Sequence, residues 1–258
     1  MRLPHSAPVL AAASAVLVAC SGPPSKLPDP TPPTRETYRY AAARISAVVI
    51  TDSNDISRWV RSEFALRNAP TDADGGSAAP ISPDGYFLTA DHVLNNSFGR
   101  RVFVIYGHGD RLDGARARIV WRSRESDLAL LKAPFATPRY YEWTPGNQWV
   151  PEGTPIIHAG IATGFDSEPG KLTSSIPPSG TFGSLRPFKH DIPLRPGDSG
   201  GAVLDARGRI VGVNSAVEFL VPLETAFFIE SEGNRPNLAR LNRMIENDRE
   251  RHRSRQAE

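Results

Sequence analysis

The chain of 258 residues contains one cysteine and two methionines, and its net charge is only +2. A single cysteine excludes a disulfide within the chain, so a folded core has to rest on burial and hydrogen bonding. The near-neutral charge gives no reason to expect a nucleic-acid partner. The six histidines are scattered and no acidic cluster has the spacing of metal ligands, so we predict no metal site and no cofactor.

The N-terminal twenty residues have the layout of a secretory signal. Arg2 precedes an apolar run from Val9 to Ala19, which is too short to span a bilayer as a permanent helix. The run ends in Leu-Val-Ala-Cys and resembles a lipobox, the site at which bacterial lipoproteins are acylated and cut. This resemblance implies a signal peptide over residues 1–19 and a lipid on Cys20. An ordinary signal with small residues near its cleavage site is the alternative.

Proline recurs through residues 20–37, which lack the apolar residues that a core needs and favour extended conformations. We predict a spacer that holds a folded domain away from a membrane surface. The membrane would then be a partner through the lipid on Cys20, on the extracytoplasmic side of a bacterial cell. Ser21 rather than Asp after the cysteine favours the outer membrane of a Gram-negative cell.

From residue 38 onward, short apolar runs alternate with turn residues, which predicts an all-β sandwich or barrel. Nine segments are strand-like: 45–50, 86–89, 101–106, 117–121, 128–131, 155–158, 201–204, 210–213 and 219–221. Four apolar residues share one face of a predicted C-terminal helix: Leu238, Leu241, Met244 and Ile245. Residues 248–258 are almost wholly polar, and we expect a frayed tail there.

The strongest chemical signal lies in Arg-Pro-Gly-Asp-Ser-Gly-Gly-Ala-Val-Leu at residues 195–204. A serine hydroxyl becomes a nucleophile only when a base takes its proton, and the resulting oxyanion needs donors already in place. Glycine at 197 lets the amides of Gly197 and Ser199, together with Asp198, face one point. We therefore predict a nucleophile at Ser199 beside an oxyanion hole, with a glycine-rich turn between strands as the alternative.

The same stretch also fits Gly-x-Ser-x-Gly, the nucleophile elbow of α/β-hydrolases, in which the acid and the histidine follow the serine. Here only His252, in the polar tail, follows Ser199. The base must therefore lie upstream. His92 stands at a polar corner after a turn and a strand, and Asp127 directly precedes an apolar strand. The order His92, Asp127, Ser199 is that of the chymotrypsin arrangement.

The other histidines have different expected places. His5 lies in the signal, and His108 lies in what looks like a hairpin turn. His158 is inside an apolar strand and is expected to be a satisfied core or surface residue. His190 is near enough to Ser199 in the sequence to line a substrate pocket, but nothing marks it as a base.

Three blocks together resemble the trypsin-like serine proteases, and most closely their bacterial HtrA/Deg branch. They are residues 82–93, 127–132 and 196–212, followed by a closing strand at 226–229 and a helix. The resemblance implies two six-stranded antiparallel β-barrels with the triad between them and a C-terminal helix. It further implies a serine endopeptidase domain over residues 38–247, an acyl-enzyme intermediate, polypeptide substrates and a possible homo-oligomer.

Four features depart from the HtrA pattern. The chain ends without a peptide-binding PDZ domain, and the loop at residues 75–80 carries Pro80 in place of a Gly-Ser-Gly pattern. Asp91 replaces a small neutral residue, and its charge should raise the pKa of the neighbouring histidine. Asp198 is typical of digestive enzymes, where it pairs with a freed N-terminus that a chain acylated at Cys20 could not easily supply. A proteolytically inactive protein that binds peptides or a partner is therefore the alternative, and an esterase with the same triad is a third.

Cleavage specificity is only partly predictable. In the trypsin-like family the residue at the bottom of the primary pocket corresponds to Pro193, so no Asp selects Lys or Arg. Ser215, Ala216 and Val217 should form a pocket wall. The resemblance therefore implies a small apolar pocket and cleavage after small or medium apolar residues.

Overall fold

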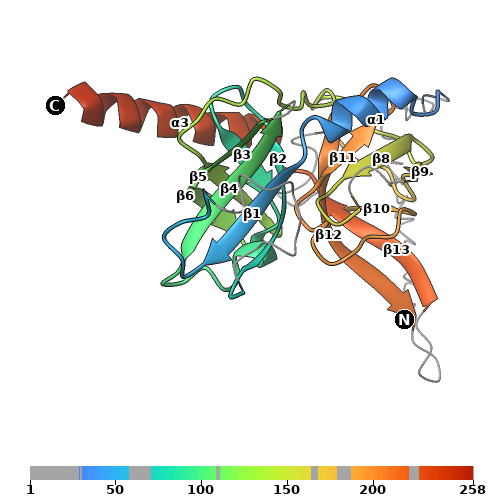
Figure 1. Cartoon of the computed structure of the whole chain (residues 1–258). Coiled ribbons are helices and arrows are strands. Elements are labelled where there is room, and N and C mark those ends of the chain that lie inside the picture. Colours follow the sequence, from blue (N-terminus) through green and yellow to red (C-terminus); the bar gives the residue numbers. More distant parts are fainter. Residues whose placement is uncertain are drawn as a thin grey trace, which may run out of the picture.

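The computed structural model describes residue 29 and the ranges 31–57, 71–108, 111–163, 168–178, 187–220 and 227–257. These residues form two antiparallel sheets that lie side by side, with helix α1 above the second sheet and helix α3 running out above the first (Figure 1). The predicted signal peptide, Cys20 and most of the spacer lie outside the described residues. Within the described ranges, no helix combines the length and apolar character needed to span a bilayer.

The first sheet has the strand order β5-β4-β1-β2-β3-β7-β6. Its strands are β1 (Ser46–Thr51), β2 (Asp74–Pro80), β3 (Tyr86–Thr89), β4 (Arg101–His108), β5 (Arg111–Arg116), β6 (Arg118–Ser123) and β7 (Leu128–Lys132). The two edge strands, β5 and β6, are one stretch of chain divided only by the buried Ala117. The chain thus passes from one edge to the other and closes a barrel of six chain segments, which is the predicted number.

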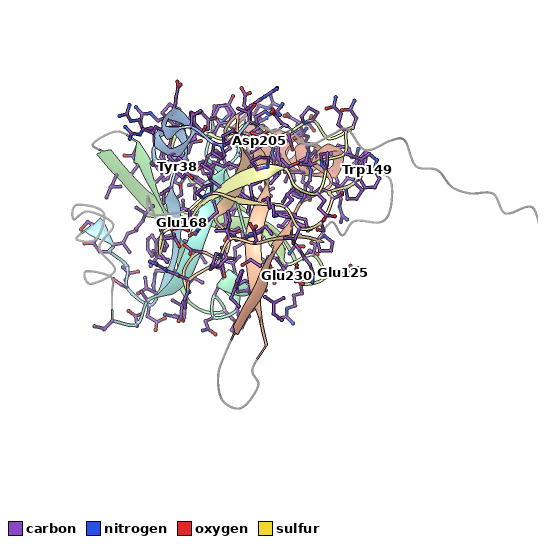
Figure 2. All side chains as sticks on the ribbon, turned by 90° about the vertical axis from the view of Figure 1, so that its right-hand side faces the viewer. Tyr38, Glu125, Trp149, Glu168, Asp205 and Glu230 are labelled. Carbon is purple, nitrogen blue, oxygen red and sulfur yellow. The ribbon has the colours of Figure 1, made fainter. Side chains whose placement is uncertain are left out.

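The second sheet has six strands in the order β10-β13-β12-β11-β8-β9. They are β8 (Pro155–Ala159), β9 (Gly170–Lys171), β10 (Pro187–His190), β11 (Ala202–Asp205), β12 (Ile210–Leu220) and β13 (Phe227–Asn234). Figure 2 shows this sheet from its own side, with Asp205 toward the top and Glu230 of β13 toward the bottom. Two curled antiparallel sheets and a C-terminal helix confirm the predicted fold class.

The residues predicted as a loop at 75–80 form β2, a central strand between β1 and β3, so that prediction is wrong. Pro80 is tolerated because it is the last residue of the strand, where it pairs with Phe87. Glycine is needed at position 76, since an added Cβ would lie 2.9 Å from the carbonyl oxygen of Ser199. The strand therefore brings the first sheet into direct contact with the predicted nucleophile.

Helix α1 (Arg35–Ala42) begins before Tyr38, inside the segment predicted as spacer. Thr34 caps it, because its hydroxyl accepts a hydrogen bond from the amide of Thr37 and the Thr37 hydroxyl interacts with Thr34 in return. The Thr37 hydroxyl also donates to the carbonyl of Ala206 at 2.9 Å. The end of the proline-rich segment is thus attached to the second sheet.

Helix α3 (Leu238–Ala257) contradicts the frayed tail expected over 248–258. As predicted, four apolar residues of its first half pack on the core: Leu238, Leu241, Met244 and Ile245. Its polar second half is held by Asp248, which is 2% exposed and accepts hydrogen bonds from the Tyr86 hydroxyl at 2.8 Å and from Arg118 at 2.6 and 2.9 Å. Because ion pairs and not apolar contacts hold this half of the helix, its sequence has no apolar periodicity from which a helix could be predicted.

Candidate active site

His92 and Asp127 meet where two paired strands end. The 3-10 turn η2 (Asp91–Leu94) follows β3, and Asp127 directly precedes β7. In the antiparallel pair, Thr89 at the end of β3 lies opposite Ala129 at the start of β7, so the flanking residues face each other. Nδ1 of His92 is 2.8 Å from Oδ2 of Asp127, and the His92 amide donates to Oδ1 at 2.8 Å.

Asp127 has a strained backbone, with a φ of 43° that is the only positive value among the described non-glycine residues. Its carboxylate accepts from the ring and the amide of His92 and from the hydroxyl of Ser215. Burial alone would raise the pKa of Asp127, but these hydrogen bonds together hold that pKa below its ordinary value. An ionised carboxylate at this position fixes the orientation and tautomer of the imidazole.

The hydrogen bond to Asp127 raises the pKa of His92 above its ordinary value. Burial opposes this change, and the negative charges of Asp127 and Asp91 add to it. The expected influence of Asp91 on the pKa of His92 is therefore confirmed in direction. The histidine side chain is 42% exposed, so its free edge remains open to a substrate.

Asp91 is almost fully buried and is neutralised by Arg122. The guanidinium lies 2.6 Å from Oδ1 and 3.1 Å from Oδ2 of Asp91, and it also donates to the Asp91 carbonyl at 3.1 Å. A further bond reaches the carbonyl of Leu94 at 3.2 Å. Arg122 therefore holds both ends of the turn that carries His92, and no sequence pattern indicates this ion pair.

Ser215 connects the predicted nucleophile, Ser199, to the predicted acid, Asp127. The register of β12 against β13 shifts between Asn214 and Ala216, so Ser215 lies at a β-bulge. Its hydroxyl donates to Asp127, and its carbonyl accepts the hydroxyl of Ser199 at 3.3 Å. Ser215 was predicted as a pocket wall, and its bond to Asp127 had no sequence signal because a bulge sets its direction.

Ser199 itself lies close to the end of β3. A Cβ added to the next residue, Gly200, would clash with the Thr89 hydroxyl and lie 3.0 Å from the amide of Ala90. Within the described part of the chain, the Ser199 hydroxyl makes no hydrogen bond with His92 and uses Ser215 as its acceptor. His92, Asp127 and Ser199 are therefore linked by hydrogen bonds, and the link from Asp127 to Ser199 runs through Ser215.

The predicted oxyanion hole is built on a tight turn. The Asp198 amide donates to the Arg195 carbonyl at 2.9 Å, and Gly197 has a φ of 105°, as a type II turn with proline before glycine requires. The Ser77 hydroxyl donates to the Gly197 carbonyl at 2.6 Å and fixes the peptide plane. Of the three predicted donors, Asp198 is engaged in the turn, whereas the amides of Gly197 and Ser199 have no acceptor among the described residues.

The carboxylate of Asp198 is fully buried and satisfied by neighbouring loops. Oδ1 accepts from the amides of Ala162 at 3.2 Å and Thr163 at 3.0 Å. Oδ2 accepts from the Arg195 amide at 2.9 Å and from the Thr163 hydroxyl. The carboxylate is thus satisfied by four donors of the folded chain, without an N-terminal amine.

The predicted substrate-pocket residues are only partly placed. Pro193 and Ala216 are exposed, and the side chain of Val217 lies outside the described part. His190 is fully buried, with Nε2 3.2 Å from Oδ1 of Asn214. Burial lowers the pKa of His190 to about 4, and the neighbouring histidine adds to this effect, so the ring is neutral and belongs to the core.

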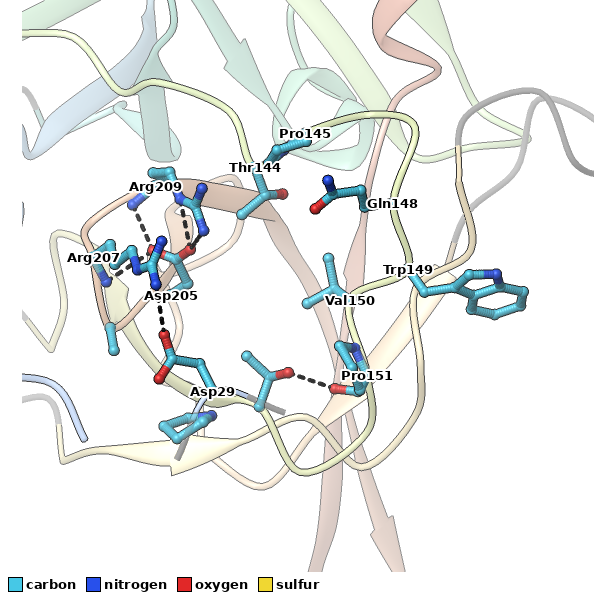
Figure 3. A pocket seen from close by; sticks show the side chains of 13 residues that line it. Asp29, Thr144, Pro145, Gln148, Trp149, Val150, Pro151, Asp205, Arg207 and Arg209 are labelled. Atoms are coloured by element: carbon cyan, nitrogen blue, oxygen red, sulfur yellow. Dashed lines mark hydrogen bonds and ion pairs between the residues drawn. The ribbon is translucent and has the colours of Figure 1, made fainter. Parts of the chain in front are cut away.

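A separate cavity of about 330 Å³ lies at the edge of the second sheet (Figure 3). Asp29 forms an ion pair with Arg207 at 3.3 Å on one side of it, while the ring of Trp149 points away. None of the predicted site residues lines this cavity. Among the described residues, no group of His, Cys, Asp and Glu side chains is arranged to hold a metal ion.

Comparisons with known proteins identify the family of this chain. The trypsin-like peptidase domain family matches residues 76–213, a range that includes His92, Asp127 and Ser199. The probable periplasmic serine endoprotease DegP-like of Pseudomonas fluorescens is 28% identical over 174 residues, covering 61% of this chain and 34% of that protein. The putative serine protease HhoB of Synechocystis is 26% identical over 183 residues, covering 66% of this chain and 42% of that protein. The chain thus spans well under half the length of these relatives.

Solved structures show the same fold. The HtrA-type protease AlgW with tripeptide has a TM-score of 0.54 and 21% identity, covering 81% of this chain and 62% of that one. Deg5 has a TM-score of 0.51 and 17% identity, covering 70% of this chain and 83% of that one. The predicted resemblance to the HtrA/Deg branch is confirmed, and the chain belongs to the trypsin-like peptidase domain family.

Proposed function

We propose that the chain is a serine endopeptidase in which Ser199 is the nucleophile, His92 the base and Asp127 the acid. One observation carries the proposal. The carboxylate of Asp127 is bound at once by the His92 ring and by the Ser215 hydroxyl, and the carbonyl of Ser215 binds the Ser199 hydroxyl. The alcohol, the imidazole and the carboxylate therefore belong to one hydrogen-bond network.

The reaction follows from these positions. The Ser199 hydroxyl turns from the Ser215 carbonyl toward His92, which takes its proton while Oγ attacks the substrate carbonyl. The amides of Gly197 and Ser199 stabilise the oxyanion, and Asp127 stabilises the imidazolium. His92 then returns the proton to the leaving amine, which leaves an acyl ester on Ser199. A water molecule, deprotonated by His92, hydrolyses that ester and frees the enzyme.

The substrates we propose are polypeptides outside the cytoplasm. The relative from Pseudomonas fluorescens is named as a probable periplasmic serine endoprotease, and AlgW was solved with a tripeptide. Exposed Pro193 and Ala216 fit a pocket without an acidic group, and hence cleavage after small or medium apolar residues. A peptide library cleaved mainly after Lys or Arg would contradict this specificity.

The location we propose is the outer face of a bacterial membrane, with a lipid on Cys20 as the anchor and the membrane as a partner. The ion pair of Asp29 with Arg207 places the middle of the spacer beside the turn between β11 and β12, so the anchor would hold the second sheet toward the membrane. Self-association into a homo-oligomer is part of the same proposal. Mass spectrometry of the chain expressed in bacteria should show diacylglycerol on Cys20 and loss of residues 1–19.

Turnover of an unstructured protein by the full-length chain tests the activity. Ser199→Ala should lower turnover by about a thousandfold or more, because the remaining contributions come only from binding and the oxyanion hole. The matched control is Ser254→Ala, since Ser254 is exposed on α3 far from the triad in sequence and fold. Retained turnover in Ser199→Ala would contradict the proposal.

A second function, peptide binding without cleavage, is favoured by one observation. The Ser199 hydroxyl points to the Ser215 carbonyl and not to His92. If this arrangement persists with substrate, the base cannot take the proton. Binding of an unstructured peptide with no turnover by the unaltered chain would then favour this second function.

A further inference from the structure

A second cavity, here called the basic cavity, lies between α3 and the first sheet and has a volume of about 750 Å³. Five cationic side chains line it: Arg116, Arg118, Lys132, Arg249 and Arg253. Among the described residues that line it, the acidic side chains are Asp84 and Asp248. Cationic side chains of this lining therefore outnumber its carboxylates by three, whereas the whole chain has a net charge of +2.

Two of the cations are paired with carboxylates. Arg118 pairs with Asp248 at 2.6 and 2.9 Å, and Arg249 pairs with Asp84 at 2.6 and 2.9 Å. Arg249 also pairs with the exposed Glu246 at 2.5 Å. The pairs with Asp248 and Asp84 attach α3 to the first sheet and form the frame of the cavity. They leave three other cations that have no carboxylate partner within the described residues: Arg116, Lys132 and Arg253.

Lys132 is the most telling of these three, because it is half-buried. Its ammonium group donates to the carbonyl of Ala133 at 2.8 Å and lies 5.4 Å from the centre of the Tyr86 ring. Burial lowers the pKa of Lys132, Asp84 offsets part of this change, and the charge of Arg118 lowers that pKa again. A cation held in such surroundings is stabilised by any anion that enters the cavity.

We propose that the basic cavity binds a phosphate-bearing anion, with its oxygens near Lys132, Arg116 and Arg253. A phosphate monoester carries nearly two negative charges and three acceptor oxygens, which matches several unpaired cations better than a single carboxylate does. Phe135 and Pro134 on the same wall provide an apolar surface for the rest of the ligand. None of the triad residues lines this cavity, so the proposal does not depend on peptidase activity.

Titration calorimetry of the full-length chain with inorganic phosphate at physiological salt tests the site. We expect saturable binding with one site per chain, and Lys132→Gln should weaken it about tenfold or more, as loss of a charge-assisted hydrogen bond does. The matched control is Lys171→Gln, because Lys171 is exposed on β9 in the other sheet. It removes the same charge and should leave the affinity unchanged.

Three results would overturn the proposal: no saturable binding, equal affinity in Lys132→Gln, or equal weakening by Lys171→Gln. Circular dichroism is used to test whether Lys132→Gln folds. If it does not, Arg253→Gln replaces it, since Arg253 is exposed near the end of α3 and should also weaken binding.

Vesicles identify the source of the phosphate. The full-length chain carrying Cys20→Ser, which cannot be acylated there, is sedimented with phosphatidylglycerol vesicles and with phosphatidylcholine vesicles. Sedimentation with phosphatidylglycerol that Lys132→Gln abolishes would assign a lipid headgroup to the cavity. Phosphate binding without vesicle binding would assign a soluble phosphate ester. Either result supports the phosphate site. Vesicle binding that Lys132→Gln does not affect would assign the membrane contact to another surface and would contradict a lipid headgroup in this cavity.

Discussion

Ser215 donates its hydroxyl to the carboxylate of Asp127 from a β-bulge in the second sheet. Asp127 directly precedes β7 of the first sheet, so this bond crosses between the two barrels. The same residue accepts the Ser199 hydroxyl through its carbonyl. The proposed acid, at one barrel, and the proposed nucleophile, at the other, are thus both bound by a single residue.

Replacing Ser215 by Ala removes one of the hydrogen bonds to Asp127 and keeps the backbone carbonyl that Ser199 uses. A bond to a charged group contributes about 1.5–3 kcal/mol, so kcat/KM should fall by about tenfold to a hundredfold. The measurement is turnover of an unstructured protein, with Ser254→Ala as control. Unchanged kcat/KM in Ser215→Ala would show that the bond between the barrels does not contribute to catalysis.

The pH dependence of activity should respond to Asp91. His92 accepts a proton only when it is neutral, so activity should be lost as pH falls through its pKa. The charge of Asp91 raises the pKa of His92, and Asp91→Asn removes that charge. The acidic limb of the kcat/KM profile should therefore move to lower pH. Glu250→Gln, which removes an exposed charge on α3, should not move it; a shift to higher pH in Asp91→Asn would contradict this mechanism.

The ion pair of Arg122 with Asp91 should stabilise the fold around His92. Arg122→Met leaves a buried carboxylate without its cation, which costs about 3 kcal/mol or more. The double variant with Asp91→Ala should recover most of that loss, because no buried charge remains. Urea unfolding of the two single variants and the double variant measures the coupling. Additive losses would show that the two residues act independently.

The hydrogen bonds of the Asp198 carboxylate lead us to expect activity without a freed N-terminus. Its carboxylate is already satisfied by Ala162, Thr163 and Arg195, so the turn that carries Gly197 is held without proteolytic activation. Chains that react with a serine probe should still carry residues 29–37, as intact-mass spectrometry can show. Labelling confined to chains that begin near Tyr38 would contradict this expectation.

His190 should make the fold sensitive to mild acid. Its pKa is about 4 in the folded state because of burial, and about 6.5 in the unfolded chain. As pH falls from 6.5 to 4, the unfolded state binds a proton at this histidine and the folded state does not. The free energy of unfolding therefore falls by about 3 kcal/mol. Urea unfolding of His190→Gln should show a smaller loss over this range than urea unfolding of the unaltered chain. An equal loss in His190→Gln would assign the effect elsewhere.

The three blocks that carry His92, Asp127 and Ser199 were found from the sequence because each combines a strand pattern with a turn. Strand β3 was predicted with the bounds that the structure has, since apolar residues and a turn delimit it. Strand β2 was missed because its glycines resemble a loop, and only the close approach to Ser199 explains them. The second half of α3 was missed because ion pairs, rather than an apolar face, hold it.

The polar contacts of the site were beyond sequence reasoning for a different reason. Asp91 was recognised as unusual, but its partner Arg122 lies on another strand, and only the sheet register brings the two together. The partners of Asp198 likewise come from a loop distant in the sequence. A sequence shows which residue needs a partner, and the fold decides which residue supplies it.

The rate at which a fluorophosphonate probe modifies Ser199 tests the proposed triad most directly, because the probe reacts quickly only with an activated serine. The unaltered full-length chain should form one adduct, on Ser199, at a rate that falls by about a hundredfold or more in His92→Ala and in Asp127→Asn. Absence of an adduct at Ser199, or equal rates in His92→Ala and the unaltered chain, would contradict the proposed catalytic role of this network.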